Sequence, residues 1–202
     1  MKELLKLIAP RMRELGFKGT GQNFRRSEGD LLSIVNFQSS RTGDVFFVNL
    51  GAQPAFVPAT GFSELKSLKE YECMLRCRVG TEWSWGMSEL ELDAMVTEIA
   101  KRSSEFFGQA LTLRQALTQA DVPELIRNFS SGTTQARAAL HLARGAHNLG
   151  LHEKAMELAN HGLAIAEDRA EFLIADLRTV LAECATATSQ PKKSAVGTIS
   201  NA

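Results

Sequence analysis

Cysteine, tryptophan and tyrosine are scarce in this sequence, with three, two and one residues respectively among 202. The cysteines are Cys73, Cys77 and Cys184, and their odd number argues against a framework of disulfides. A chain of this kind fits a reducing compartment. We therefore expect a cytoplasmic protein.

Long apolar runs are also missing. No stretch approaches the roughly 18 apolar residues of a membrane-spanning helix. The first residues, MKELLKLIAPRMREL, mix acidic with apolar side chains and lack the apolar core of a signal peptide. We expect no membrane partner.

No excess of charge of one sign exists, because 23 Lys and Arg residues balance 23 Asp and Glu residues. Nothing global therefore attracts nucleic acid, and we consider a nucleic-acid partner unlikely. Locally the N-terminal part is basic: Arg11, Arg13, Lys18, Arg25 and Arg26 outweigh Glu14. Such a run is most often a solvated face, and a phosphate-binding patch is the alternative.

Motifs for cofactors and metals are absent as well. The sequence contains no P-loop, no Gly-x-Gly-x-x-Gly after a strand, no nucleophile elbow and no His-Glu-x-x-His, so we predict no cofactor. All four histidines lie in the predicted C-terminal helical hairpin, and His147 and His152 flank the turn between its two helices. Exposed histidines at helix ends are much commoner than ligands, so we predict no metal site.

Turning to what is present, residues 4–15 have helical periodicity that Pro10 interrupts, so the helix either kinks there or begins near Ala9. About four strands follow, at residues 22–26, 31–39, 45–50 and 73–85. A short helix is predicted for Ser63 to Glu70. Trp83 and Trp85 close the last strand, where we expect them to cap the edge of the core or to stack on a ligand.

A two-residue loop at Thr42-Gly43 would pair Arg41 with Asp44 and fix the register of the two longest strands. That register places Asn36 opposite Asn49, with Gln38 opposite Phe47 on the same face. It places the apolar residues Val35, Phe37, Val48 and Leu50 on the other face. The sheet is therefore predicted to have one apolar face and one amide-bearing polar face.

Alternation in ECMLRCRVGTEWSW places Arg76 and Arg78 on the polar face. It places Cys73 and Cys77 together on the other face, roughly 13 Å apart, too far to share a metal without other ligands. Carboxylates are nearly missing from the polar face, although Glu72, Glu82 or Asp44 could reach it from strand ends.

The second half of the chain is predicted to be helical. Ser88 and Glu91 form a capping box before an amphipathic helix, and Asp121 caps a shorter one. Small-residue ridges predict an αα-hairpin over residues 134–168, similar to one tetratricopeptide unit, and Leu173, Leu177, Val180 and Cys184 predict one more helix. Residues 186–202 have the composition of a disordered tail.

These patterns predict an α+β fold, in which an antiparallel sheet packs on helices. The predicted organisation is a domain at residues 1–110, a helical segment at 111–185 and the tail.

Four pieces of the sequence carry a family resemblance: ELGFKGTGQNFRR, IVNFQSSR, FFVNLGA and CMLRCRVG. In this order they resemble a bacterial family known only as a domain of unknown function, over about residues 1 to 110. The resemblance implies an α+β domain and no established activity. That family often has histidine where this chain has Met74, so the resemblance implies no histidine-dependent chemistry at that position.

The polar face leaves more than one function open. It is a solvated sheet face, or it binds a ligand through Asn36, Gln38, Arg41, Asn49, Arg76, Arg78 and Trp83. If it binds, we expect a non-enzymatic module for a protein partner or a small anionic ligand. The alternative is an enzyme on a nucleotide or another phosphorylated substrate, with Arg76 and Arg78 as an anion clamp.

Overall fold

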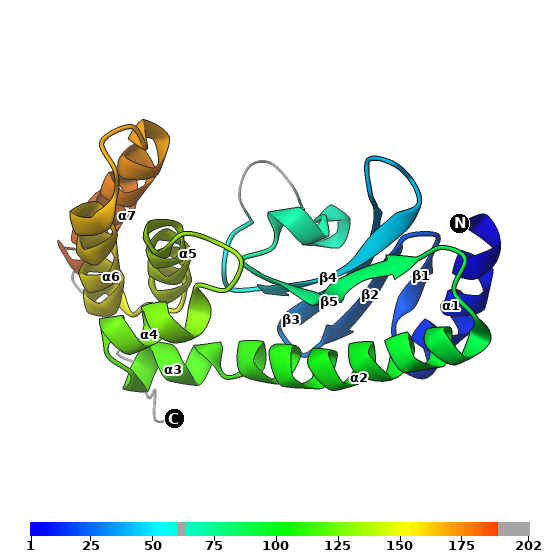
Figure 1. Ribbon diagram of the computed structural model, residues 1–202. Helices are drawn as coiled ribbons and strands as arrows, with labels where there is room; N and C mark the ends of the chain where they lie inside the picture. The colour runs from blue at the N-terminus through cyan, green and yellow to red at the C-terminus, as the bar shows by residue number, and fades with distance from the viewer. Residues whose placement is uncertain (60–63, 190–202) are drawn as a thin grey trace, which may run out of the picture.

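The structure is a computed structural model that describes residues 1–59 and 64–189. An antiparallel sheet lies over the long helix α2 (Glu89–Leu111), and the later helices gather at one end of the sheet (Figure 1). Helix α1 (Lys2–Glu14) lies at the opposite end. The predicted α+β fold with a C-terminal helical part is confirmed.

Five strands make up the sheet in the described part of the chain, in the order β1-β2-β3-β4-β5, each antiparallel to its neighbour. They are β1 (Lys18–Thr20), β2 (Asn23–Glu28), β3 (Leu31–Ser39), β4 (Val45–Pro54) and β5 (Leu75–Ser84). The prediction of about four strands missed β1. Backbone pairing with β2 alone defines this strand, and a three-residue segment between glycines has no side-chain alternation to reveal it.

The register between β3 and β4 is the predicted one, with Asn36 opposite Asn49 and Val35 opposite Leu50. The connection is longer than predicted, because the strands end at Ser39 and begin again at Val45. Ser40 N–H donates to the carbonyl of Val45 at 2.9 Å, which closes this five-residue loop.

Helix α1 contains Pro10 in its interior, so of the two alternatives the start near Ala9 is wrong. Proline removes one backbone hydrogen bond there. The helix persists because its apolar face is buried, with Ile8 and Met12 fully inaccessible to solvent. Packing of that face offsets the local cost.

Helix α2 begins as predicted, at Ser88, whose side chain accepts from Glu91 N–H while the Glu91 carboxylate accepts from Ser88 N–H at 2.7 Å. Its buried residues Leu92, Met95, Ile99 and Phe107 face the apolar side of the sheet. This contact forms the centre of the main core.

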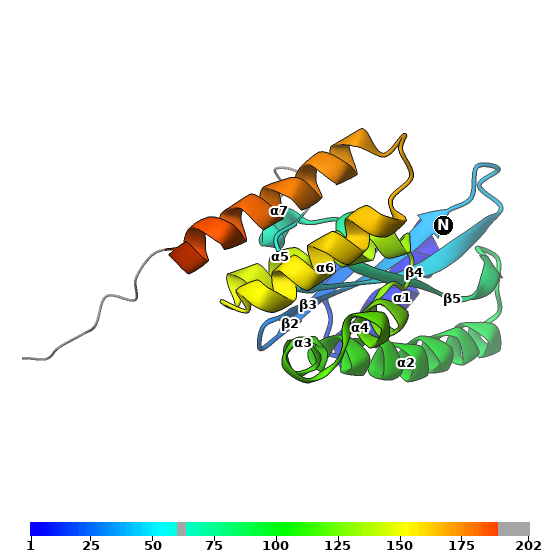
Figure 2. The ribbon, with the colours of Figure 1, turned by 90° about the vertical axis from the view of Figure 1, so that its left-hand side faces the viewer.

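The remaining helices are α3 (Leu113–Gln119), α4 (Val122–Phe129), α5 (Gln135–Asn148), α6 (His152–Ile165) and α7 (Glu171–Ser189). Asp121 caps α4 as predicted. Figure 2 shows α5, α6 and α7 packed side by side. The two small-residue ridges are buried between them, which confirms the αα-hairpin.

Two predicted segments differ from the structure. In place of a short helix ending at Glu70, the described residues contain the 3-10 turns η1 (Leu65–Ser67) and η2 (Glu70–Glu72), while residues 60–63 lie outside the described part. The predicted tail begins too early, since α7 continues to Ser189; from residue 190 on it lies outside the described residues.

The helical part is fastened to the edge of the sheet at β5. Arg76 N–H donates to the carbonyl of Ser131 at 3.1 Å, and the Ser131 hydroxyl donates to the carbonyl of Arg76 at 2.8 Å. One apolar core runs without interruption from α1 through the sheet to Cys184 on α7.

Candidate functional site

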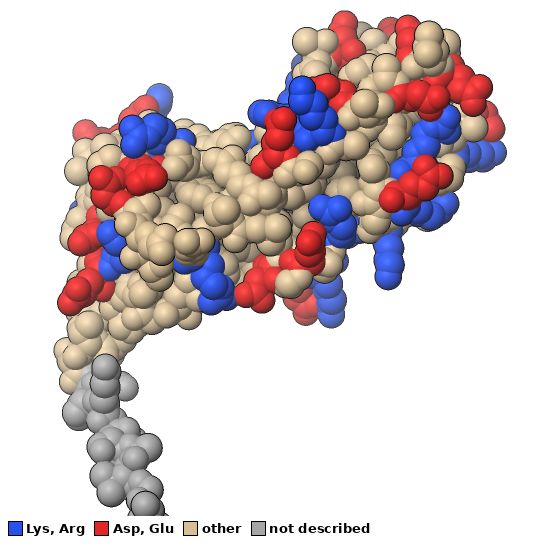
Figure 3. All heavy atoms as spheres, turned by 90° about the horizontal axis from the view of Figure 1, so that it is seen from below, with Lys and Arg blue, Asp and Glu red and all other residues tan. Residues whose placement is uncertain are grey.

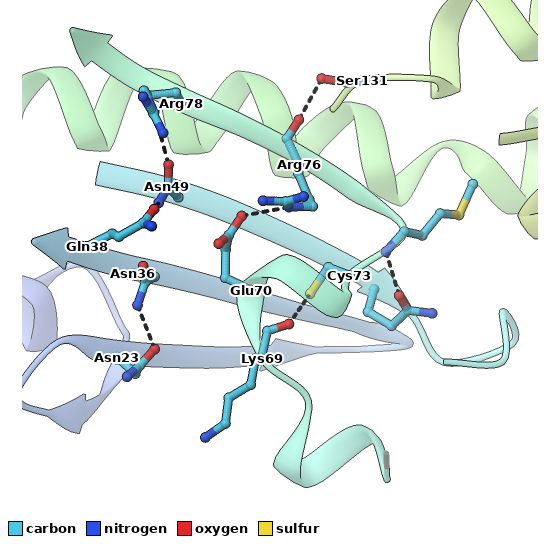
Figure 4. Close-up of polar contacts among 12 residues, drawn as sticks. Asn23, Asn36, Gln38, Asn49, Lys69, Glu70, Cys73, Arg76, Arg78 and Ser131 are labelled. Carbon is cyan, nitrogen blue, oxygen red and sulfur yellow. Dashed lines mark hydrogen bonds and ion pairs between the residues drawn. The ribbon is translucent and has the colours of Figure 1, made fainter. Parts of the chain in front are cut away.

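The polar face of the sheet carries two hydrogen-bonded pairs of amide side chains. Asn36 Nδ2 donates to Asn23 Oδ1 at 2.9 Å, and Asn49 Nδ2 donates to Gln38 Oε1 at 2.9 Å (Figure 4). Asn49 is 5% exposed, whereas Gln38 is open to solvent. The amides therefore hold one another in fixed orientations at the surface.

Arg78 is hydrogen-bonded to Asn49, a member of the second pair. Its Nε donates to Asn49 Oδ1 at 3.2 Å, and its guanidinium carbon lies 4.2 Å from the centre of the Phe47 ring. Within the described residues Arg78 forms no ion pair. An exposed guanidinium that is held from below by an amide and a ring offers its remaining N–H groups to an anion.

Arg76 lies on the same face but is already paired. Its Nε donates to Glu70 Oε1 at 2.9 Å, and the Glu70 side chain is 5% exposed (Figure 4). Glu70 comes from η2, which lies over the sheet. Sequence reasoning missed this carboxylate, because it named Glu72, Glu82 and Asp44 as the acidic residues near the face.

Half of the polar face is covered. The segment from η1 to Cys73 packs on Leu32 and Ile34, and together they form a second, smaller apolar cluster with Leu68 and Cys73. Arg25 donates to the carbonyl of Lys66 at 2.6 Å and to that of Leu68, which fastens the segment to β2. The open half begins at Asn36, and its members are Asn23, Asn36, Gln38, Phe47, Asn49 and Arg78.

Gln53 lies under the covered half and is 1% exposed. Its amide donates to the carbonyl of Val57 at 2.6 Å and accepts from Met74 N–H at 2.7 Å. It is a further polar residue of β4 that the alternation pattern could have revealed, since it has the parity of Asn49. Its contacts give it a structural role.

Cys73 and Cys77 do not share a face, contrary to prediction. β5 begins only at Leu75, so Cys73 precedes the alternation and packs in the small cluster, whereas Cys77 packs against the main core. Burial, together with the nearby Glu70 carboxylate, raises the pKa of the Cys73 thiol to about 12. A thiol that stays protonated is a poor nucleophile.

Two predicted site residues lie elsewhere. Trp83 packs against the main core, and its Nε1 donates to the carbonyl of Val79 at 3.4 Å. Trp83 has the parity of Cys77 and Val79, so alternation alone assigns it to the core face. It is paired with the buried Phe46 and caps the core edge, the first of the two expected roles. Arg41 is exposed in the loop beyond the last β3–β4 pair.

Charge elsewhere on the surface is mixed. On the side formed by α2, Lys and Arg alternate with Asp and Glu, with no large area of one sign (Figure 3). On the polar face, by contrast, basic residues prevail: the strands contribute Lys18, Arg25, Arg76 and Arg78, against the exposed Glu82 of β5, which has the parity of Arg76 and Arg78. Among the described residues, no helix has the length and apolarity needed to cross a bilayer.

Comparison with known proteins gives one positive result. A family model described as a domain of unknown function matches residues 8–113, the sheet and the helices that cover it. No curated protein and no solved structure matches the chain.

Proposed function

The chain belongs to that family, Domain of unknown function (DUF4304), which covers more than half of it, and we propose that it is a non-enzymatic binding module of the bacterial cytoplasm. The open half of its polar face would bind an anionic group, carried by an acidic protein partner or by a phosphate-bearing ligand. The observation that carries the proposal is Arg78, exposed, held by Asn49 and Phe47, and free of any ion pair in the described part.

The surroundings of Arg78 support an anion. Basic residues prevail among the strand residues of this face, where Glu82 is outnumbered by arginine and lysine, and Glu70, which reaches the face from η2, is neutralised by Arg76. Asn36 and Gln38 lie on β3, across Asn49 from Arg78, and supply neutral donors and acceptors. Fixed amides next to one free guanidinium suit a ligand that combines negative charge with hydrogen-bonding groups.

The fold gains little from these residues. Valine or threonine would suit strand positions 36 and 49 better than asparagine does. The side-chain partners of Asn36 and Asn49 are within reach of water: Asn23, Gln38 and Arg78. Asn36 also donates at 3.5 Å to the carbonyl of Gln22, which already accepts from Phe37 N–H at 2.8 Å. Residues that weaken a strand without satisfying a buried backbone group are expected at functional positions.

The enzyme alternative has less support. An anion clamp needs both arginines, and Arg76 is occupied by Glu70. The nearest thiol, Cys73, is held protonated by burial. The strands of the open half carry mainly amides and arginine, which are poor general acids and bases at neutral pH, and the carboxylate of β5, Glu82, is exposed to solvent.

The first test is capture of partners from the native host with the full chain, followed by mass spectrometry and titration calorimetry with any partner identified. We expect Arg78→Glu to abolish binding and Asn49→Val to weaken it about tenfold or more, because Arg78 loses its support. The free energy of unfolding of both variants should lie within about 1 kcal/mol of that of wild type. Each substitution leaves without a partner only side chains that water can solvate.

Arg127→Glu is the matched control, because Arg127 is exposed on α4, away from the sheet. The melting temperature measured with a panel of phosphorylated compounds distinguishes a phosphate-bearing ligand from an acidic protein partner. A compound that raises the melting temperature of wild type but not of Arg78→Glu identifies a phosphate-bearing ligand. If Arg78→Glu and Arg127→Glu behave alike in every assay, the polar face is only a solvated surface.

A further inference from the structure

Three side chains that the sequence separates meet at the end of the αα-hairpin. His147 lies in the last turn of α5, His152 is the first residue of α6, and Cys184 comes from α7. We propose that these three residues form a zinc site. It lies outside the matched family region and is independent of the function proposed for the sheet.

The distances are close to those of a metal site. His147 Nδ1 is 3.3 Å from Cys184 Sγ, the two imidazole rings are 5.1 Å apart, and the three ligand atoms lie within 4.8 Å of one another. Zinc–nitrogen and zinc–sulfur bonds of about 2.0–2.3 Å place tetrahedral ligand atoms about 3.3–3.8 Å apart. Small side-chain rotations of the histidines therefore bring the set to bonding geometry.

Burial favours a ligand at this place. Cys184 is fully buried, and both histidines are half-buried. The Nδ1 atom of His152 is buried and has no hydrogen-bond partner in the described part of the chain. An unpaired buried polar atom costs free energy, and coordination at this imidazole would order the ring and bring it a partner.

The donor types select zinc. One thiolate and two imidazoles suit a borderline cation such as Zn²⁺ and suit Mg²⁺ or Ca²⁺ poorly, since those prefer oxygen. Three protein ligands leave a fourth tetrahedral position for water or another ligand. His152 also lines a surface groove with Lys154, Glu157 and Thr188, which gives the metal a path from solvent.

Burial raises the pKa of the Cys184 thiol, and the neighbouring Glu183 carboxylate adds to the effect. Zinc must therefore displace a proton from Cys184 when it binds. Zinc affinity should fall as the pH is lowered, because both the thiol and the imidazoles must be unprotonated.

The experiment uses the tag-free full chain after treatment with a chelator. Titration with Zn²⁺ should show one ion per chain, and Co²⁺ should give a near-ultraviolet thiolate charge-transfer band. Cys184→Ser should abolish the band, and His152→Gln should weaken Zn²⁺ binding by more than about 100-fold, beyond the effect of losing a residue that only supports a ligand.

Two matched variants retain the proposed ligands. His161→Gln changes a half-buried histidine further along α6, and Cys77→Ser changes a cysteine in the sheet; both should bind Zn²⁺ and Co²⁺ like wild type. His152→Gln remains informative if Cys184→Ser does not fold, because its side chain is only half-buried. Absence of stoichiometric Zn²⁺ binding, or binding unchanged in His152→Gln, overturns the site and leaves the His147–Cys184 contact as packing.

Discussion

At the scale of single residues, polar side chains on the same face of one strand have opposite roles. Asn49 bonds to two side chains that water can reach, whereas Gln53, four residues along β4, bonds to two buried backbone groups. Glu70 and Arg76 neutralise each other beneath η2. Whether an amide serves binding or stability is decided by what it touches.

Gln53→Leu is expected to lower the free energy of unfolding by about 2–5 kcal/mol, because it leaves Met74 N–H and the Val57 carbonyl buried without partners. Urea denaturation measures the loss. Gln115→Leu is the control, since Gln115 is exposed on α3 and bonds only to the Gln119 side chain. Equal stability of the two variants would contradict the structural role of Gln53.

His141 makes the stability of the native state depend on pH. Burial, with Arg144 and Arg137 nearby, lowers its pKa from 6.5 to about 4. As the pH falls below about 6.5 the unfolded chain takes up a proton that the folded chain refuses, so stability falls by about 3 kcal/mol by pH 4, at about 1.4 kcal/mol per pKa unit. His141→Leu should lack this component.

Urea denaturation of wild type and His141→Leu between pH 7 and pH 4 measures the difference. The two stability curves should diverge as the pH falls, with the variant retaining more stability. Parallel curves would show that His141 accepts its proton in the folded state. Leucine is a suitable replacement because His141 Nδ1 is buried without a hydrogen-bond partner in the described residues.

At the scale of elements, close backbone approach holds the αα-hairpin. A Cβ atom at Gly162 would lie 2.9 Å from Leu177 Cδ2 and 3.1 Å from Ala139 Cβ. α6 is thus wedged between α5 and α7 at this point, and larger side chains must push the helices apart.

Gly162→Leu should therefore destabilise the protein by about 1–3 kcal/mol through overpacking. Asn160→Leu adds the same side chain at an exposed position of α6 and should change stability by less than about 0.5 kcal/mol. Thermal or urea melts compare the two. Similar losses would mean that the small-residue ridge does not set the helix spacing.

At the scale of the whole molecule, the sheet and the helical part share one core and one backbone junction. The segment before α5 pairs with β5 at Arg76, and it makes its tight turn at Gly132, where φ is +75°. A Cβ at this glycine would lie 2.5 Å from the Arg76 carbonyl oxygen. No other residue type fits there without moving the junction.

Gly132→Ala and Gly150→Ala form a matched pair, because both glycines have φ +75° but a Cβ at Gly150 would meet no atom within 4 Å. Both substitutions impose the same backbone strain. Gly132→Ala should cost about 1–3 kcal/mol more, the cost of overpacking at a fixed contact. Equal unfolding free energies in urea would show that the junction yields without cost.

The sequence by itself determined most of the helices and strands and the two faces of the sheet. Alternation identified β3, β4 and most of β5, and it separated Val35 and Leu50 from Asn36 and Asn49 with the correct register. Cap chemistry placed the starts of α2 and α4 at Ser88 and Asp121. These features depend on residues within a few positions of one another, where side-chain geometry acts directly on the backbone.

Only the tertiary structure decided which parts of those faces are open. It laid η2 over half of the polar face and paired Glu70 with Arg76. It also brought Cys184 to His147 and His152. These contacts join segments that are far apart in the sequence. The local sequence of each segment is compatible with several packing partners, and the burial of one shared core determines which of them it contacts.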